Sequence, residues 1–495
     1  MKTFTRRAAL FGAGAIFGGW LTHHFTSTNP SLDGTATIAG AGGEGKLNDA
    51  SGLSETPIFR HSILTEDPGD ALVKAIRAEI ADARAEERPV NVGAARHSMG
   101  GQAIPHDGHA LTFDSAWIEP DIGNSTMLVH AGARWHQVIS ALDPLGFGPR
   151  VMQSNNDFGV AATFCVNAHG WPVKIGPMGA SVRSFDMVLP DGGLVSCSRT
   201  ENPGLFGMTM GGYGLTGAIT RMEVDIAPNQ RLAPTFEKLD SRDFGQRFTE
   251  ALDDTSVTMA YGRLNVDRAH FFDQALLITY RATEDQSALP PASGSGTLSK
   301  LSRQIYRAQL GNERMKRIRW WTETDLGPKL GGGPSTRNSL INEPVVTLDD
   351  RDPNRTDILH EYFVPPDRFA DFIDVCRQVI PASYQEFLNV TLRYVDTDPD
   401  SWLAYAPQPR IAAVMSFSQE MTARAEADMK RMTQALIEGI LGVGGTYYLP
   451  YRPHARQEQF VHAYPRAAEF AKAKRELDPQ GIFRNNFWDT YMETL

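Results

Sequence analysis

The chain has 495 residues, with 58 acidic and 48 basic side chains and a formal net charge of −10. This length predicts two or three domains. The basic residues form no stripe that could neutralise a phosphate backbone, which argues against nucleic acid as a partner. The three cysteines, Cys165, Cys197 and Cys376, are isolated, so neither a disulfide framework nor a Cys-x-x-Cys metal or redox site is expected.

Residues 1–21 have the pattern of an export signal. Lys2, Arg6 and Arg7 precede a charge-free apolar run from Ala8 to Leu21. The arginine pair resembles a twin-arginine signal, whose machinery exports folded proteins, and predicts a protein of the bacterial periplasm. The run is shorter than the roughly 20 residues that span a bilayer. No clean Ala-x-Ala site follows it, so an uncleaved membrane tether is the alternative.

The next segments predict a linker and an α+β domain. Residues 22–56 are rich in Gly, Ser, Thr and Ala, which indicates a flexible linker. Residues 57–229 alternate short β-type runs with Gly-rich turns and two amphipathic helices. The runs lie at 88–92, 111–113, 126–130, 187–190 and 219–226, and the helices at 70–84 and 135–142.

Two further segments complete the chain. Residues 230–440 contain expected strands at 269–272 and 360–365, helices at 367–379 and 423–439, and a loop at 284–297 that is indicated by its Ser, Pro and Gly content. Residues 441–495 contain an expected helix at 465–477, followed by Asp478-Pro-Gln-Gly.

One glycine motif invites a dinucleotide interpretation that the pattern around it opposes. Gly212-Tyr-Gly-Leu-Thr-Gly217 matches G-x-G-x-x-G. That fingerprint needs a helix after it, whereas residues 218–226 alternate as a strand. We therefore expect these glycines to let the backbone pass close to a flat group. An NAD-dependent dehydrogenase is a rival that this motif alone supports.

Two other stretches predict the walls of a cofactor site. Val90-Asn-Val runs into the small-residue turn Gly93-Ala-Ala-Arg-His-Ser-Met-Gly-Gly101, whose backbone N–H groups could bind a pyrophosphate. His97 at its tip is either a polar loop residue or a nucleophile beside a cofactor. Residues 153–170 supply small side chains that admit a planar ligand. His169 lies in that stretch without ligand-spaced partners, so it is expected to be structural or flavin-facing and no metal site is predicted.

These segments together resemble a known family. In order and spacing, residues 93–102, 159–170, 176–192 and 211–220 resemble the FAD-binding PCMH-type domain of the vanillyl-alcohol-oxidase superfamily, and residues 360–365 and 464–485 resemble its cap strand and C-terminal return. Sugar-lactone oxidases, alditol oxidases and the decaprenylphosphoryl-ribose oxidase are the most similar branches. The resemblance implies a two-subdomain FAD-binding domain at 57–229, an α+β cap domain at 230–440 and a C-terminal return at 441–495.

The resemblance also implies the cofactor and its contacts. It places FAD on His97, bound covalently through the flavin 8α-methyl group. Asp157 stands at about the position where some members carry a second, cysteine link, so a single link is expected. The expected cofactor contacts are Gly93, Ala94, Ala95, Arg96, His97, Ser98, Met99, Gly100, Gly101, Gln102, Ser154, Asn155, Ala161, Ala162, Val166, His169, Gly170, Gly217, Ile219, Tyr448 and Asn485.

The substrate end departs from the family pattern. Thr391 stands where lactone and alditol oxidases have Glu, while Arg393 keeps their Arg; in a strand the two share a face. The alternative is that Arg393 is a surface residue. Tyr451 replaces a lysine, and Tyr451-Arg452-x-His resembles the phenol-oxidising branch, whose aspartate base has no counterpart in residues 171–181. The expected catalytic residues are Tyr451, Arg452 and Arg393.

The expected activity is hydride transfer from a CH–OH group of a polyol, sugar or sugar lactone to flavin N5. Oxygen or a respiratory acceptor would then take the electrons. Two alternatives stay open. One is an oxidase of para-substituted phenols or benzylic alcohols, and the other is a flavin-binding protein without catalysis.

Overall fold

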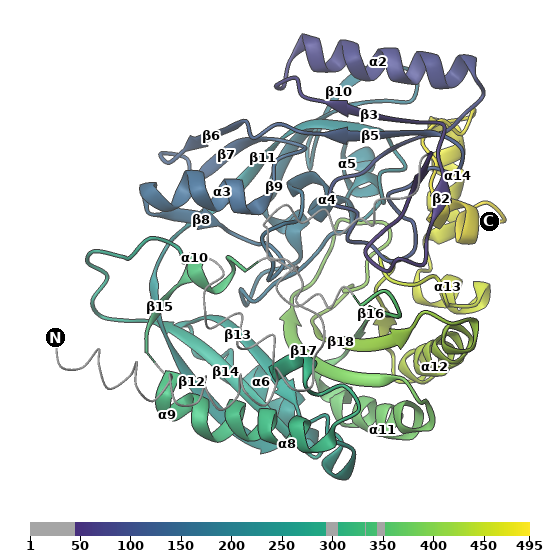
Figure 1. Ribbon diagram of the computed structural model, residues 1–495. Coiled ribbons are helices and arrows are strands. Elements are labelled where there is room, and N and C mark those ends of the chain that lie inside the picture. Colours follow the sequence, from purple (N-terminus) through teal and green to yellow (C-terminus); the bar gives the residue numbers. More distant parts are fainter. Residues whose placement is uncertain (1–44, 294–304, 332, 344–351) are drawn as a thin grey trace.

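The computed structural model describes residues 45–293, 305–331, 333–343 and 352–495. The predicted export signal and the linker up to residue 44 lie outside these ranges. Within them, no helix is long and apolar enough to cross a membrane. Two lobes are stacked on each other, an N-terminal lobe above and a central lobe below, with the C-terminal segment along one side of both (Figure 1).

The N-terminal lobe contains two sheets. One is parallel with the order β3-β5-β4, and the other is antiparallel with the order β10-β9-β11-β7-β6 and β8 added to β11. Helix α2 contacts β4 of the first sheet and β9 and β11 of the second. The elements are β3 (Arg60–Leu64), α2 (Asp70–Ala85), β4 (Val90–Val92), β5 (His109–Phe113), β6 (Ile118–Asp121), β7 (Thr126–His130), α3 (Trp135–Leu142), β8 (Phe147–Pro149), α4 (Val160–Cys165), β9 (Val182–Val188), β10 (Leu194–Ser198), α5 (Pro203–Thr209) and β11 (Ala218–Pro228).

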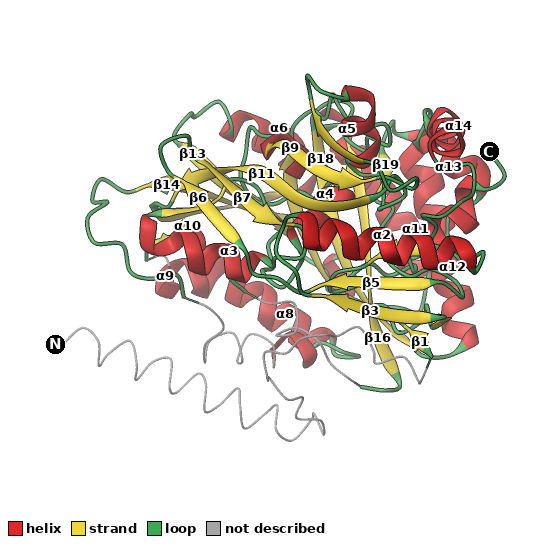
Figure 2. Cartoon of the chain, turned by 90° about the horizontal axis from the view of Figure 1, so that it is seen from above, coloured by secondary structure: helices red, strands yellow, loops and turns green. Residues whose placement is uncertain are grey.

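The central lobe is built on one eight-stranded sheet, ordered β15-β12-β14-β13-β17-β18-β16-β19. Helices α8, α11 and α12 lie on the outer side of the lobe in Figure 1, and Figure 2 shows the long strands crossing behind the N-terminal sheets. The elements are β12 (Arg231–Asp240), α6 (Phe244–Ala251), β13 (Val257–Leu264), β14 (Gln274–Ala282), α8 (Glu313–Trp321), α9 (Gly327–Gly331), β15 (Ser335–Thr336), α10 (Arg337–Leu340), β16 (Arg355–Val364), α11 (Phe369–Val379), β17 (Glu386–Val395), β18 (Arg410–Glu420), α12 (Ala423–Gly442) and β19 (Thr446–Tyr447).

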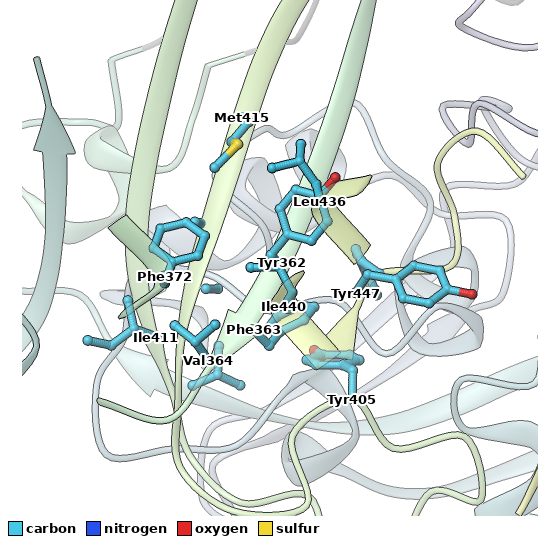
Figure 3. Packing of buried hydrophobic residues seen from close by; sticks show 14 of the residues in the cluster. Tyr362, Phe363, Val364, Phe372, Tyr405, Ile411, Met415, Leu436, Ile440 and Tyr447 are labelled. Atoms are coloured by element: carbon cyan, nitrogen blue, oxygen red, sulfur yellow. The ribbon is translucent and has the colours of Figure 1, made fainter. Parts of the chain in front are cut away.

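The two faces of β16 meet different surroundings because side chains alternate along a strand. His360 and Tyr362 share one face, where His360 lies 3.3 Å from the Thr433 hydroxyl of α12. Figure 3 shows Tyr362 in this apolar layer with Leu436 and other side chains. The opposite face carries Glu361 and Phe363. It is turned toward the N-terminal lobe, since the Phe363 ring packs edge-on against His169.

Most of the expected elements are present, and two expectations were wrong. Residues 269–272, expected as a strand, form a 3-10 turn (Arg268–His270), because the Asp267 side chain accepts hydrogen bonds from the next backbone N–H groups. The expected linker also ends earlier than residue 56. The strands β1 (Lys46–Leu47) and β2 (Thr56–Pro57) pair, and the buried Asp49 accepts from Gly101 N at 2.8 Å.

The expectation of a strand after the G-x-G-x-x-G motif was right. A strand, β11, follows Gly217 directly, so no helix N-terminus is available to bind a pyrophosphate there. Gly217 adopts a φ of 154°, and a Cβ at this position would lie 2.5 Å from the Val188 carbonyl. Glycine is required by this close approach to β9.

The C-terminal segment returns the chain to the N-terminal lobe through α13 (Gln457–Ala463) and α14 (Ala467–Leu477). Asp478 follows α14 and is buried. It accepts from Lys474 Nζ at 2.5 Å and from the backbone N–H groups of Ile482 and Phe483 at 2.9 and 2.8 Å. Phe483 then forms a parallel bridge with Val90 of β4. One buried carboxylate thus holds the return in place.

We expect Asp478→Ala to lower the free energy of unfolding by about 3–5 kcal/mol, because it leaves the buried Lys474 ammonium without a counter-charge. Urea denaturation followed by circular dichroism measures this. Glu469→Ala, which removes an exposed ion pair with Arg466 on the same helix, is the control and should scarcely move the midpoint. Equal midpoints for the two variants would show that the hydrogen bonds and the ion pair of Asp478 contribute little to stability.

Candidate active site

A cavity of about 800 Å³ lies between the two lobes. The N-terminal lobe contributes the turn after β4 and the segment around α4, and the central lobe contributes the face of its sheet that carries Glu361. Behind the cavity the lobes are joined by backbone hydrogen bonds, from Val173 N to Thr258 O and from Ala260 N to Trp171 O. Main-chain contacts therefore fix the two lobes relative to each other at this edge of the cavity.

The turn after β4 offers unpaired backbone donors. In the described parts of the chain, no protein group accepts from the N–H groups of the five residues from Ala94 to Ser98. Met99 N donates to Pro450 O, Gly100 N to the Gln102 side chain and Gly101 N to Asp49. A run of N–H groups that face a cavity without acceptors binds phosphate oxygens well.

The buried Arg96 lies in the same turn and lines the cavity. Its Nη2 donates to the Thr112 hydroxyl, while Nε has no partner among the described residues. Burial and the nearby Arg134 lower the pKa of Arg96 to about 10, so it stays charged at neutral pH. A buried cation beside free N–H donors fits a pyrophosphate.

Small residues bring the two walls of the cofactor site together. A Cβ on Gly159, at the start of α4, would lie 2.8 Å from the Cβ of Ala94 in the turn. Ala161 and Ala162, which follow Gly159 in α4, line the cavity. Gly159 and Ala94 are therefore in direct contact, and the small side chains beside this contact leave room in the cavity for a planar ring system.

Most of the residues expected to contact the cofactor line this cavity. They are Gly93, Ala94, Ala95, Arg96, His97, Ser98, Met99, Gln102, Ser154, Asn155, Ala161, Ala162, Val166, His169, Gly217, Ile219 and Tyr448. The catalytic candidates Tyr451 and Arg393 line it as well.

Four expected contacts do not line the cavity. Gly100 and Gly101 turn toward Gln102 and Asp49, as described above, and Gly170 packs against Met152, where a Cβ would lie 1.9 Å from the carbonyl oxygen. Asn485 is buried behind the turn. Its Nδ2 donates to the carbonyls of Gln102 and Tyr213, at 2.7 and 2.8 Å. These residues shape the site from behind it.

His97 is held beside an acid and an aromatic ring. Its side chain is 4% exposed, and its Nε2 lies 3.3 Å from Asp157 Oδ2. The Phe158 ring is 4.3 Å away, centroid to centroid. Nδ1 has no hydrogen-bond partner in the described residues. Nε2 makes no hydrogen bond in the described residues either, so both ring nitrogens of His97 are available.

The central feature of the site is a hydrogen-bonded trio that crosses the lobes. His169 Nε2 is bonded to Glu361 Oε1, and the Tyr451 hydroxyl donates to Glu361 Oε2 at 3.2 Å. His169 and Glu361 are both buried. Burial lowers the pKa of His169, against the opposing effect of the Glu361 charge, and raises that of Tyr451 well above its ordinary value. At neutral pH the imidazole is therefore neutral and the phenol is protonated.

Arg393 of β17 adds a buried cation, so the alternative of a surface arginine was wrong. It donates to the His169 carbonyl at 3.2 Å and to the Ser154 hydroxyl at 2.9 Å. Its Nε has no partner in the described parts of the structure. Thr391, on the same face, accepts from Arg263 of the neighbouring strand β13.

The expectation for Arg452 was wrong. Its guanidinium points away from the cavity and donates to Glu426 Oε1 at 2.6 Å and to the Met99 carbonyl at 3.2 Å. His454 bonds to the same carboxylate at 2.8 Å. Burial would raise the pKa of Glu426, but His454 and Arg452 together lower it. The pair fastens α12 to the turn after β19 and is structural.

Sequence reasoning missed Glu361 as a site residue. The strand His360-Glu-Tyr-Phe-Val-Pro was used only for its resemblance to a cap strand. A single carboxylate within an apolar strand was the available signal, since charged residues are seldom buried without a partner.

Comparisons with known proteins agree with this geometry. Residues 72–198 match the model of an FAD binding domain. Cytokinin dehydrogenase 5 of rice (Oryza sativa subsp. japonica) is 23% identical over 92% of this chain and 94% of its own length. An alditol oxidase of a Streptomyces species is 30% identical, over 28% of this chain and 33% of its own. The crystal structure of 6-hydroxy-D-nicotine oxidase from Arthrobacter nicotinovorans has a TM-score of 0.57 at 14% identity, over 92% of this chain and 96% of that one.

The cavity, its phosphate-binding turn and these matches define a flavoprotein oxidoreductase with FAD as its cofactor. The chain contains an FAD-binding domain at residues 72–198 and is similar to flavin-dependent oxidases and dehydrogenases, and its α+β architecture with a cap lobe is the fold expected from the sequence.

We expect Gly159→Val to reduce FAD retention. Gly159 has φ −74° and ψ 144°, which any residue adopts, so the effect arises from the new side chain meeting Ala94. The ratio of flavin to protein absorbance after purification measures it, and circular dichroism checks the fold. Gly204→Val, at the start of α5, is the control and should retain FAD, because no atom lies within 4 Å of a Cβ added at Gly204. An equal flavin content in both variants would show that the close contact between Gly159 and Ala94 is not needed for FAD binding.

Proposed function

We propose that the protein oxidises a CH–OH group of a polyol, sugar or sugar-lactone-like substrate, with FAD held covalently by His97. The observation that carries this proposal is the His169–Glu361–Tyr451 trio beside Arg393 on the cavity wall. Oxidation of an alcohol requires removal of a hydroxyl proton and a hydride, and this group of residues can manage the proton.

His169 is the proposed base. Because Nε2 is bonded to Glu361, the proton sits on Nε2 and the Nδ1 lone pair is free to accept the hydroxyl proton. No described residue is bonded to Nδ1. Glu361 then stabilises the imidazolium that forms, as a buried carboxylate does for the histidine of a hydrolase triad.

Arg393 and Tyr451 act on the substrate oxygen and on Glu361. The Arg393 guanidinium lies beside His169 and would stabilise negative charge that develops on the oxygen as its proton leaves. Tyr451, with its raised pKa, serves as a hydrogen-bond donor that fixes Glu361. Bound FAD supplies the hydride acceptor at N5.

Two alternatives are less well supported. Oxidation of phenols would use Tyr451 and Arg452 together, but Arg452 is bound to Glu426 outside the cavity. The full-length relatives are named for a cytokinin and for 6-hydroxy-D-nicotine, which makes oxidation next to a nitrogen the second candidate. The first experiment is therefore an anaerobic screen in which bleaching of the flavin is measured. Its panel contains polyols, sugar lactones, phenols, isopentenyladenine and 6-hydroxynicotine. Bleaching by none of them favours a binding protein.

We expect His169→Gln to slow flavin reduction roughly 100- to 10,000-fold, the contribution of a general base. Anaerobic stopped-flow measurement with the best substrate of the panel gives this rate, normalised to bound FAD. Glu361→Gln should slow it less, since the amide still accepts from Nε2. His61→Gln, on an exposed part of β3, is the matched control. Unchanged reduction in His169→Gln would remove this residue from the chemistry.

The pH profile of the same rate separates a base from a packing residue. Since burial lowers the pKa of His169 below its ordinary value of 6.5, reduction should persist at pH 6.5 and fall only at lower pH. Glu361→Gln removes the charge that raises this pKa and should move the fall to still lower pH. A fall centred above pH 6.5 would contradict the assignment.

We expect the flavin to remain with the wild-type protein after acid precipitation and to be released from His97→Ala. Both ring nitrogens of His97 lack a hydrogen-bond partner in the described residues, and the Asp157 carboxylate lies 3.3 Å from Nε2, so the imidazole is the proposed nucleophile. Flavin fluorescence in the washed pellet measures the attached fraction. A colourless wild-type pellet would refute the covalent link and leave FAD binding in place.

A further inference from the structure

The floor of the cavity has two chemically different ends. In the pairing register, Arg263 of β13 lies opposite Thr391, Thr391 opposite Val414, and Val414 opposite Glu361 of β16. All four residues line the cavity. Strands in a sheet lie about 4.8 Å apart, so the Cα atoms of Arg263 and Glu361 are about 14 Å apart. One end carries Glu361, which is bonded to the proposed base His169, and the other end carries the Arg263 guanidinium.

The groups that contact the guanidinium are neutral. The nearby Arg393 adds a second cation: burial lowers the pKa of Arg393, and the charge of Arg263 contributes to this lowering. Arg263 donates to the Thr391 hydroxyl, and its guanidinium carbon lies 5.2 Å above the Tyr261 ring. Tyr261 stacks on Trp171, which also lines the cavity, with centroids 4.4 Å apart. Over the described ranges, no carboxylate lies within 4.0 Å of Arg263.

The acids that line the cavity already have partners. Asp49 binds Ser51 and Gly101, Asp357 is paired with Arg307, and Glu361 binds His169 and Tyr451. Asp352 accepts from Asn354, and Glu343 is also engaged. The positive charge of Arg263 is therefore not neutralised by the described part of the chain. A ligand that fills the cavity would strip water from this charge, which is unfavourable unless the ligand supplies an anion.

We propose that the substrate carries a carboxylate, which Arg263 binds, and that the hydroxyl to be oxidised lies at the His169 end. The substrate class is a hydroxylated carboxylic acid with several carbons between the two groups, such as a sugar acid. The planar guanidinium matches a carboxylate with two parallel hydrogen bonds, and the Trp171–Tyr261 pair covers it from one side. This inference rests on the proposed alcohol oxidation, whose residues lie at the other end of the row.

Gluconate and sorbitol test the proposal, because they share a six-carbon polyol chain and differ at one end in a carboxylate. In anaerobic stopped-flow mixing with the oxidised holoenzyme, the shift of the flavin absorbance that precedes flavin reduction gives Kd. We expect gluconate to bind at least tenfold more tightly than sorbitol. Arg263→Gln should reduce this preference by about tenfold or more, the contribution of a charge-assisted hydrogen-bonded pair. Arg263→Lys should restore part of it.

Arg281→Gln is the matched control, since Arg281 lies on β14 of the same sheet and pairs with Asp254 outside the cavity. The proposal is overturned if sorbitol binds as tightly as gluconate, or if Arg263→Gln and Arg281→Gln have the same preference. Failure of the alcohol oxidation gives a different result: gluconate still shifts the absorbance in an Arg263-dependent way, but neither compound reduces the flavin.

Discussion

The site depends on one hydrogen bond that crosses the two lobes. Glu361 stands on β16 of the central lobe and His169 follows α4 of the N-terminal lobe, and their side chains meet in a buried position. A charge that is buried in this way is stable only while its partners are in place. The catalytic arrangement therefore exists only when the lobes are docked, and the main-chain bonds around Trp171 and Val173 maintain that docking.

The rest of the structure arranges the surroundings of this contact. The alternation of β16 sends Tyr362 into the apolar layer of Figure 3 and leaves Glu361 facing the cavity. Arg393 spans His169 and Ser154 and so ties the central sheet to the segment before α4. On the other wall, the N–H groups of residues 94–98 have no protein acceptor among the described residues, whereas those of the next three residues donate to protein acceptors. The N-terminal lobe thus supplies the proposed cofactor turn, whereas the proposed proton-transfer groups come from both lobes.

Most residues that the sequence predicted for the cofactor end line the cavity, whereas Glu361 was missed and Arg452 lies outside it, for a physical reason. The turn at 93–98 offers backbone N–H groups, and Gly159, Ala161 and Ala162 leave space because their side chains are small. Both properties can be recognised from the local sequence. Helices such as α3 were also located closely, because their apolar periodicity is local. Glu361 is different, since its role depends on meeting His169 from a segment 192 residues away.

Arg452 illustrates the opposite error. Its neighbour Tyr451 faces the cavity, but consecutive residues in a turn point in different directions, and Glu426 of α12 attracts the guanidinium away. Glu426, which determines the orientation of the Arg452 side chain, is not part of the Tyr451-Arg452-x-His motif. Residues 45–56 were expected to be flexible from their composition, yet the buried contact of Asp49 with Gly101 fixes them.

The most direct measurement of the central claim is a crystal structure of the FAD-loaded protein with an unreactive substrate analogue in the cavity. We expect the hydroxyl of the analogue to lie within about 2.6–3.2 Å of His169 Nδ1 while Nε2 stays bonded to Glu361. A hydroxyl bound beyond hydrogen-bond reach of His169, with the Glu361 contact broken, would contradict it.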